Sequence, residues 1–96
     1  MDRVWIVMGS TGEYSDRTEW PVIAFTSEAA AKERITELEV KMQQMPQEWR
    51  EERWEHEDKI KAHMASLDAS FLMDYTGTHY FFYEVPVAPA PMSAHQ

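Results

Sequence analysis

Three short segments in which apolar residues alternate along the chain predict β-strands. They cover residues 3–8, 19–25 and 79–85, and their two-residue period is that of a strand whose side chains point to opposite faces of a sheet. Pro21 lies inside the second segment and has no backbone N–H to donate, which makes this an edge strand or one that begins late. All three segments carry apolar residues on both faces.

The charged middle of the chain has the period of an α-helix. A first helix is expected to begin at Thr26 or Ser27, because a hydroxyl there can accept from the free N–H groups of the first turn. Pro46 disfavours helical geometry in the residue before it, so this helix should end near residues 44–45. Its apolar stripe has spacings of four, three, four and three, and consists of Ala31, Ile35, Leu38, Met42 and Met45.

A second helix is predicted from Pro46 to about Leu67, with one long helix kinked at Pro46 as the alternative. Its apolar stripe consists of Trp49, His56, Ile60, Met64 and Leu67. After it, residues 71–73 suggest a short extra strand or a buried loop, and residues 74–78 contain a turn signal.

The order β-β-α-α-β predicts an α+β fold in which a three-stranded or four-stranded sheet has a helical hairpin or kinked helix on one face. Residues 1–87 are expected to form one domain, and the proline-rich residues 88–96 a disordered tail. Helices on one side would leave aromatic surface on the other, with Trp5, Trp20 or Phe82 exposed there. Such a surface favours self-association, and a homodimer is the expected state.

Composition and charge exclude several classes of protein. Nine basic and seventeen acidic side chains give the 96 residues a formal net charge of −8, which disfavours direct binding to nucleic acid. The absence of cysteine excludes disulfides and thiolate metal sites. No apolar run approaches the ~20 residues of a membrane span. The sequence therefore predicts a soluble, cytoplasmic protein that does not associate with membranes.

Residues 9–17 read Gly-Ser-Thr-Gly-Glu-Tyr-Ser-Asp-Arg, a longer and more polar connection than a tight hairpin needs. We interpret this segment as a contact loop in which Glu13, Tyr14, Asp16 and Arg17 bind a partner. A phosphate-binding role is disfavoured, because the segment lacks the lysine of a P-loop and leads to a strand instead of a helix.

Trp54 is a second candidate for partner binding. On a helical wheel it falls on the charged side of the second predicted helix, about 140° from the apolar stripe. It is either an exposed anchor of the kind that dominates interfaces or a side chain that packs over the neighbouring helix or the tail.

Metal-dependent and nucleophilic chemistry find little support. His56 and His63 stand about 10 Å apart along a helix axis, too far for both rings to bind one ion. Serine and threonine are frequent in the first loop, but no strained nucleophile turn or oxyanion loop is recognisable. We therefore expect no metal, no cofactor, no catalytic residues and no enzymatic activity.

Several stretches near the two ends of the chain resemble small uncharacterised proteins of phages and prophages. These are GSTGEYSDR at 9–17, EWPV at 19–22 with the following AF at 24–25, DYTGT at 74–78 and YEVP at 83–86. The resemblance implies a phage or prophage origin and transfers no activity. It also suggests a mode of action, because small acidic phage proteins often bind a host protein.

Two functional hypotheses follow. In the first, the protein binds and modulates a basic host protein, which could be a nucleic-acid-binding defence factor, through aromatic surface and acidic charge. In the second, it binds a small molecule or nucleotide between the first loop and the 74–78 turn. The second hypothesis requires both loops to meet at one end of the sheet, and its candidate residues are Ser10, Thr11, Gly12, Asp74 and Thr76.

Overall fold

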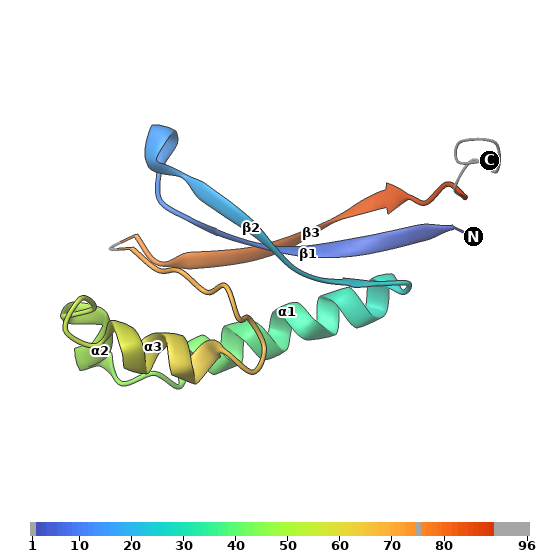
Figure 1. The fold of residues 1–96 in the computed structure, drawn as a ribbon. Helices are drawn as coiled ribbons and strands as arrows, with labels where there is room; N and C mark the ends of the chain where they lie inside the picture. The colour runs from blue at the N-terminus through green and yellow to red at the C-terminus, as the bar shows by residue number, and fades with distance from the viewer. Residues whose placement is uncertain (1, 75, 90–96) are drawn as a thin grey trace, which may run out of the picture.

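The computed structural model describes residues 2–74 and 76–89, which form an α+β fold (Figure 1). The elements in chain order are β1 (Arg3–Thr11), the 3-10 turn η1 (Tyr14–Asp16), β2 (Thr18–Phe25), α1 (Glu28–Gln43), α2 (Gln47–Glu51), α3 (Glu57–Met64) and β3 (Thr78–Pro86). The three strands make one antiparallel sheet in the order β2-β1-β3. The helices lie together on one face of this sheet, as the alternation of strands and helices predicted.

The central strand is longer than predicted, and the first loop is correspondingly shorter. Residues 9–11 belong to β1, where Ser10 pairs with Glu19 on one side and with His79 on the other. The glycine, serine and threonine that suggested a loop are strand residues because they have a partner strand on both sides. The connection to β2 is therefore limited to residues 12–17.

The edge position predicted for the strand that contains Pro21 is confirmed. β2 lies at one edge of the sheet, and its register against β1 shifts between Val7 and Met8, where Met8 stands opposite Pro21. An irregularity at this point is expected because Pro21 cannot donate a ladder hydrogen bond.

The first helix begins and packs as predicted. The Ser27 side chain accepts a hydrogen bond from the Ala30 backbone N–H at 3.2 Å, which caps α1. All five residues of the first apolar stripe belong to the core or pack against it, and Ala31 and Leu38 are completely buried. This stripe holds α1 against the sheet.

The prediction of a second helix that is continuous to Leu67 is wrong. Two short helices, α2 and α3, are separated by residues 52–56, and the chain turns back along α1 (Figure 1). The last carbonyl groups of a helix lack partners within it, and here the returning chain supplies them. Arg50 donates to the Met42 carbonyl oxygen at 2.6 Å, and His63 Nε2 donates to that of Lys41, also at 2.6 Å. These bonds favour a hairpin over a kinked helix.

The segment between α3 and β3 adds no strand to the sheet. Its described residues contain one isolated bridge, between Asp74 and Gly77. Phe71 is only 2% exposed and joins the core, whereas Leu72 is partly exposed. The sheet of the described residues is thus three-stranded, and residue 71 belongs to a buried loop.

One part of the prediction about the two sheet faces is wrong. Trp20 is buried on the helix side, and Trp5 and Phe82 pack against the core there. Because neighbouring strand residues point to opposite faces, the side turned away from the helices carries Ile6 and Phe81 instead. Trp20 and Phe82 stand opposite Gly9 and Val7 of β1, and the register therefore puts them on the same side as Trp5.

Candidate functional site

The connection between β1 and β2, residues 12–17, is called the hairpin tip. Thr11 and Thr18 form the last pair of the two strands, and the tip closes through η1, where the Asp16 backbone N–H donates to the Glu13 carbonyl oxygen at 3.0 Å. Gly12 has a φ of +93°, and a Cβ there would lie 2.5 Å from the Asp16 carbonyl oxygen. Gly12 is therefore required by the shape of the loop, as a positive φ favours glycine.

Tyr14 stands out within the hairpin tip. Its φ of +53° makes it the one non-glycine residue with a positive φ among the described residues. Tyrosine pays about 1 kcal/mol or more for this conformation. The side chain is 93% exposed, so no packing within the fold offsets the cost. The hairpin tip thus displays an aromatic ring to solvent at the expense of stability.

The charged residues of the hairpin tip are exposed, but Arg17 already has a partner. Its Nε donates to Glu19 Oε2 at 2.8 Å, and both side chains are largely solvent-accessible. An ion pair with this exposure contributes at most about 1 kcal/mol. Glu13 and Asp16 are exposed as well, so the four predicted partner-binding residues of this loop share one surface with a net negative charge.

The hairpin base and the 74–78 turn meet at one end of the sheet, which is the geometry that the ligand-binding hypothesis requires. The Thr11 hydroxyl donates to the Gly77 carbonyl oxygen at 2.6 Å and accepts from the Asp74 backbone N–H at 3.0 Å. The Gly12 N–H donates to Thr76 Oγ1 at 3.3 Å. Four of the five candidate ligand-binding residues therefore bind one another, and the fifth, Ser10, is buried.

The hydrogen bonds that join Thr11 and Gly12 to residues 74–77 are called the latch. The carboxylate of Asp74 is the acceptor at its centre. The Thr76 hydroxyl and the Thr76 backbone N–H both donate to Asp74 Oδ1. These bonds, with the Thr76 hydroxyl as the largest cause, hold the pKa of Asp74 below its usual value, and the positive charge of Arg53 acts in the same direction. Asp74 therefore stays ionised at neutral pH.

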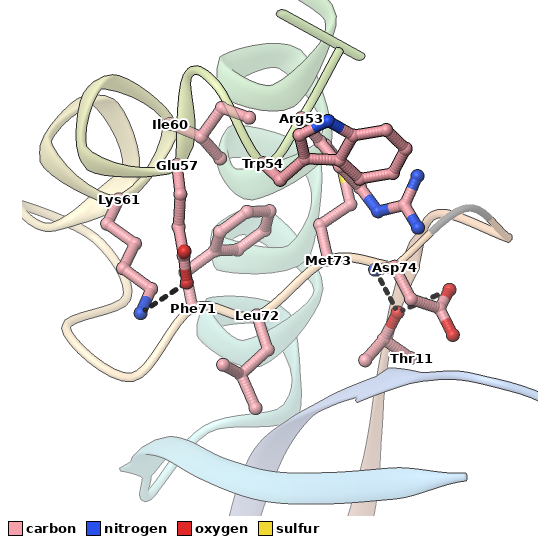
Figure 2. A pocket seen from close by; sticks show the side chains of 10 residues that line it. All are labelled: Thr11, Arg53, Trp54, Glu57, Ile60, Lys61, Phe71, Leu72, Met73 and Asp74. Carbon is pink, nitrogen blue, oxygen red and sulfur yellow. Dashed lines mark hydrogen bonds and ion pairs between the residues drawn. The ribbon is translucent and has the colours of Figure 1, made fainter. Parts of the chain in front are cut away.

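A cavity of about 300 Å³ opens beside this latch (Figure 2). Its apolar lining comes from Ile60 of α3 and from Phe71, Leu72 and Met73 of the following segment. The polar and aromatic residues that complete the lining are Thr11, Arg53, Trp54, Glu57, Lys61 and Asp74.

Trp54 forms the rim of this cavity and is 68% exposed. It lies between α2 and α3, on the turn that the sequence had assigned to a helix. The guanidinium carbon of Arg53 lies 4.9 Å from the centre of the Trp54 ring, which places the cation over the ring face. Of the two interpretations of Trp54, the exposed ring agrees with the structure. The cavity brings Trp54 together with Thr11 and Asp74, which the sequence had assigned to different hypotheses.

His56 and His63 both pack against the ring of Trp49. His56 stacks on Trp49 with 6.5 Å between ring centres, and His63 meets the same ring edge-on at 6.0 Å. A different group of donors, missed by the comparison of histidine spacings, consists of Glu52, Glu55 and His56, whose potential ligand atoms lie within 4.8 Å of one another. Two carboxylates and an imidazole are donors that Zn²⁺ accepts.

Sequence reasoning also missed a buried polar cluster around Asp68. This carboxylate is 2% exposed and accepts from Trp20 Nε1 at 2.9 Å, from the Tyr80 hydroxyl at 2.7 Å and from the Ser70 backbone N–H at 3.1 Å. Burial, with the adjacent carboxylate, raises the pKa of Tyr80 far above its ordinary value. Asp68, Trp20 and Tyr80 come from distant parts of the chain, so no local sequence motif predicts their contact. The Trp20 N–H and the Tyr80 hydroxyl both donate to Asp68, so the cluster ties β2 and β3 to the segment that follows α3.

No protein-family model, curated protein or solved structure matches the chain. Among the described residues, no helix combines the length and the apolar character needed to cross a bilayer.

Proposed function

We propose that this chain is a non-enzymatic interaction protein, of phage or prophage origin, that binds and modulates a basic host protein through its hairpin tip. Within this proposal it acts in the host cytoplasm, and a nucleic-acid-binding defence factor is one kind of target. The observation that carries the proposal is the conformation of Tyr14, which combines a positive φ with 93% exposure.

A strained residue persists where another requirement opposes stability. Tyr14 satisfies no packing requirement, since the described structure places no other side chain over it and η1 buries no residue. An exposed tyrosine supplies a large, rigid contact area at an interface. Binding of its ring to a partner supplies the function that outweighs the conformational cost.

The charges around Tyr14 favour a basic partner. Glu13 and Asp16 flank the ring on the hairpin tip, and the chain carries a formal net charge of −8. Complementary charge accelerates association and discourages acidic competitors. The surfaces that proteins use to bind nucleic acid are basic, so a nucleic-acid-binding protein would offer the complementary charge.

The test uses Tyr14→Asn, because asparagine tolerates a positive φ better than tyrosine. We expect this variant to be as stable as the wild type or more stable, by up to about 1 kcal/mol, and to lose capture of the host protein from a lysate. Trp54→Ser, which removes an exposed aromatic ring elsewhere, serves as the matched control and should retain capture.

Two results would contradict the proposal. If Tyr14→Asn unfolds more easily and still captures its partner per folded molecule, then Tyr14 serves the fold. If capture survives in Tyr14→Asn and disappears in Trp54→Ser, the cavity rim is the binding surface.

A Glu13→Gln and Asp16→Asn double variant separates charge steering from the ring, because it should slow association and leave the fold unchanged.

The cavity beside Trp54 supports a second candidate function, the binding of a small apolar or aromatic molecule. Its volume of about 300 Å³ is at the lower end of the range for ligand pockets, and an incoming ring could stack on Trp54. The polar groups of the latch are committed to one another, which disfavours a nucleotide. A thermal-shift screen tests this candidate, since a ligand at a hundred times its Kd adds ~2.7 kcal/mol to the free energy of unfolding.

A further inference from the structure

The side of the sheet turned away from the helices forms a continuous apolar surface, here called the open sheet face. Trp5 and Val7 of β1 contact the helix side, so the residues between and beside them point the other way. The cross-strand partners of those residues share their face. The open sheet face consists of Val4, Ile6, Met8, Pro21, Ala24, Phe81, Tyr83 and Val85.

Three directly opposed pairs form the middle of this surface. Val4 stands opposite Val85, Ile6 opposite Tyr83, and Met8 opposite Phe81. These are the partly exposed side chains of the sheet that are absent from the hydrophobic core, and Tyr83 is 46% exposed. Figure 1 shows the helices on the other side of the sheet and no described element over this one.

The open sheet face carries no charged side chain, although the chain is strongly acidic. The charged Glu19 and the polar His79 lie on the same side of the sheet, but only toward the end that leads to the hairpin tip. An apolar centre with a polar border is typical of protein interfaces. Contact between such a surface and water is unfavourable, so a partner that covers it is favoured.

We propose that a second copy of this chain covers the open sheet face, so that two sheets pack face to face around a two-fold axis. Charge complementarity favours a copy over a basic host protein, because the apolar middle of this face offers no carboxylate, and Glu19 at its border is already paired with Arg17. A copy presents the same uncharged surface, and an isologous interface needs only that one patch. Two aligned sheets interdigitate their side chains at a separation of about 10 Å.

The size of the surface can be compared with that of stable interfaces. Strands of eight and nine residues at ~3.3 Å per residue, in three rows ~4.8 Å apart, cover about 30 by 14 Å, or roughly 400 Å² per copy before the relief of the side chains is added. Stable interfaces bury about 800 Å² per partner. The face is about half that size, so a weak and reversible dimer is expected.

The net charge of each copy opposes this dimer only weakly. The acidic residues of the helices lie across the sheet from the interface, with a whole layer of each copy between them. The Debye length at physiological ionic strength is about 8 Å, which is shorter than that separation. Repulsion between the helix layers is thus largely screened.

Sedimentation velocity over a dilution series tests the proposal. The wild type should shift from two chains toward one as its concentration falls. The double variant Ile6→Thr with Tyr83→Thr removes apolar area and retains β-favouring residues, and it should sediment as a single chain at every concentration with an unchanged circular dichroism spectrum. Tyr14→Ser with Trp54→Ser removes aromatic rings outside the open sheet face and should dimerise like the wild type.

Cross-linking supplies a second readout that does not depend on the stability of the double variant. The chain contains no cysteine, so Ile6→Cys introduces a unique thiol at the middle of the central strand. A short bismaleimide should join two copies of this variant and leave Glu37→Cys, on the outer side of α1, unjoined. The proposal is overturned if the wild type is a single chain throughout the dilution series, or if both cysteine variants cross-link equally. A single chain whose capture of a host protein is abolished by the double variant would assign the open sheet face to that protein.

Discussion

Gly9 illustrates how one residue can be misinterpreted from sequence. A glycine beside serine and threonine suggests a loop, yet Gly9 lies within β1. A Cβ at this position would lie 2.5 Å from the Trp20 ring, which stands opposite on β2. The glycine provides room for an indole ring, and the need for that room is visible only when the two strands are paired.

Asp68 is expected to be the most sensitive polar residue of the fold. Asp68→Ala leaves the Trp20 N–H and the Tyr80 hydroxyl buried without an acceptor, and each unsatisfied group costs about 1–3 kcal/mol. Urea unfolding followed by tryptophan fluorescence should show a loss of at least about 2 kcal/mol. Asp68→Asn keeps one acceptor oxygen and should lose less. Equal losses in both variants would show that the hydrogen bonds contribute little.

The latch at Asp74 predicts a dependence of stability on acid. The pKa of Asp74 is lower in the folded protein than the 3.8 of an unperturbed aspartate. The carboxylate therefore stabilises the fold above pH 3.8, and this contribution is lost as the pH falls below that value through the folded pKa. Asp74→Asn should have a lower Tm than the wild type at pH 7, and the difference should shrink at pH 2–3. A difference independent of pH would assign the effect to packing.

At the scale of elements, the connection from α1 to α3 depends on bonds to the end of α1. Arg50 donates to the Met42 carbonyl oxygen, and a charged donor of this kind contributes about 1–2 kcal/mol. Arg50→Ala should lower the free energy of unfolding by about 1 kcal/mol. Lys32→Ala, which breaks the exposed pair with Glu28, is the control and should change it by less than about 0.5 kcal/mol. An Arg50→Ala effect as small as that of the control would show that packing alone holds the helical hairpin.

The same elements show where periodicity is informative. The stripe of α1 was predicted residue by residue because a continuous helix turns through a constant angle at each position. The second stripe predicted the buried residues Ile60 and Met64 but not the interruption at 52–56. Glu52, Arg53 and Glu55 are of residue types that form helices well, so the local sequence does not predict the interruption.

At the scale of the whole molecule, the two proposed contacts should respond to salt in opposite directions. Binding of a basic partner at the hairpin tip depends on charge and should weaken as sodium chloride rises from ~50 to ~500 mM, because the Debye length falls. Self-association through the uncharged open sheet face should strengthen slightly, since the weak repulsion that remains between two acidic copies at low salt is screened. Capture assays and sedimentation velocity at both salt concentrations measure the two effects. A dimer that dissociates in high salt would contradict the assignment to this face.

The sequence by itself determined the strands, the first helix, the edge position of Pro21 and the α+β class. These features depend on the local period of apolar residues and on backbone groups that proline lacks, and both are readable along the chain. It also identified an exposed loop around Tyr14, although with the wrong first residues. Side-chain types and spacing were sufficient for these conclusions.

Only the tertiary structure decided which face of the sheet is covered, where Trp20 lies and how Asp68 is satisfied. Each of these depends on contacts between residues far apart in the chain, such as Trp20 and Asp68. An apolar alternation on both faces of a strand is compatible with a helix layer on either one. The positive φ of Tyr14 was also beyond the sequence, because no residue type there demands it. That conformation belongs to the hairpin tip, where Gly12 also has a positive φ, and it carries the functional proposal.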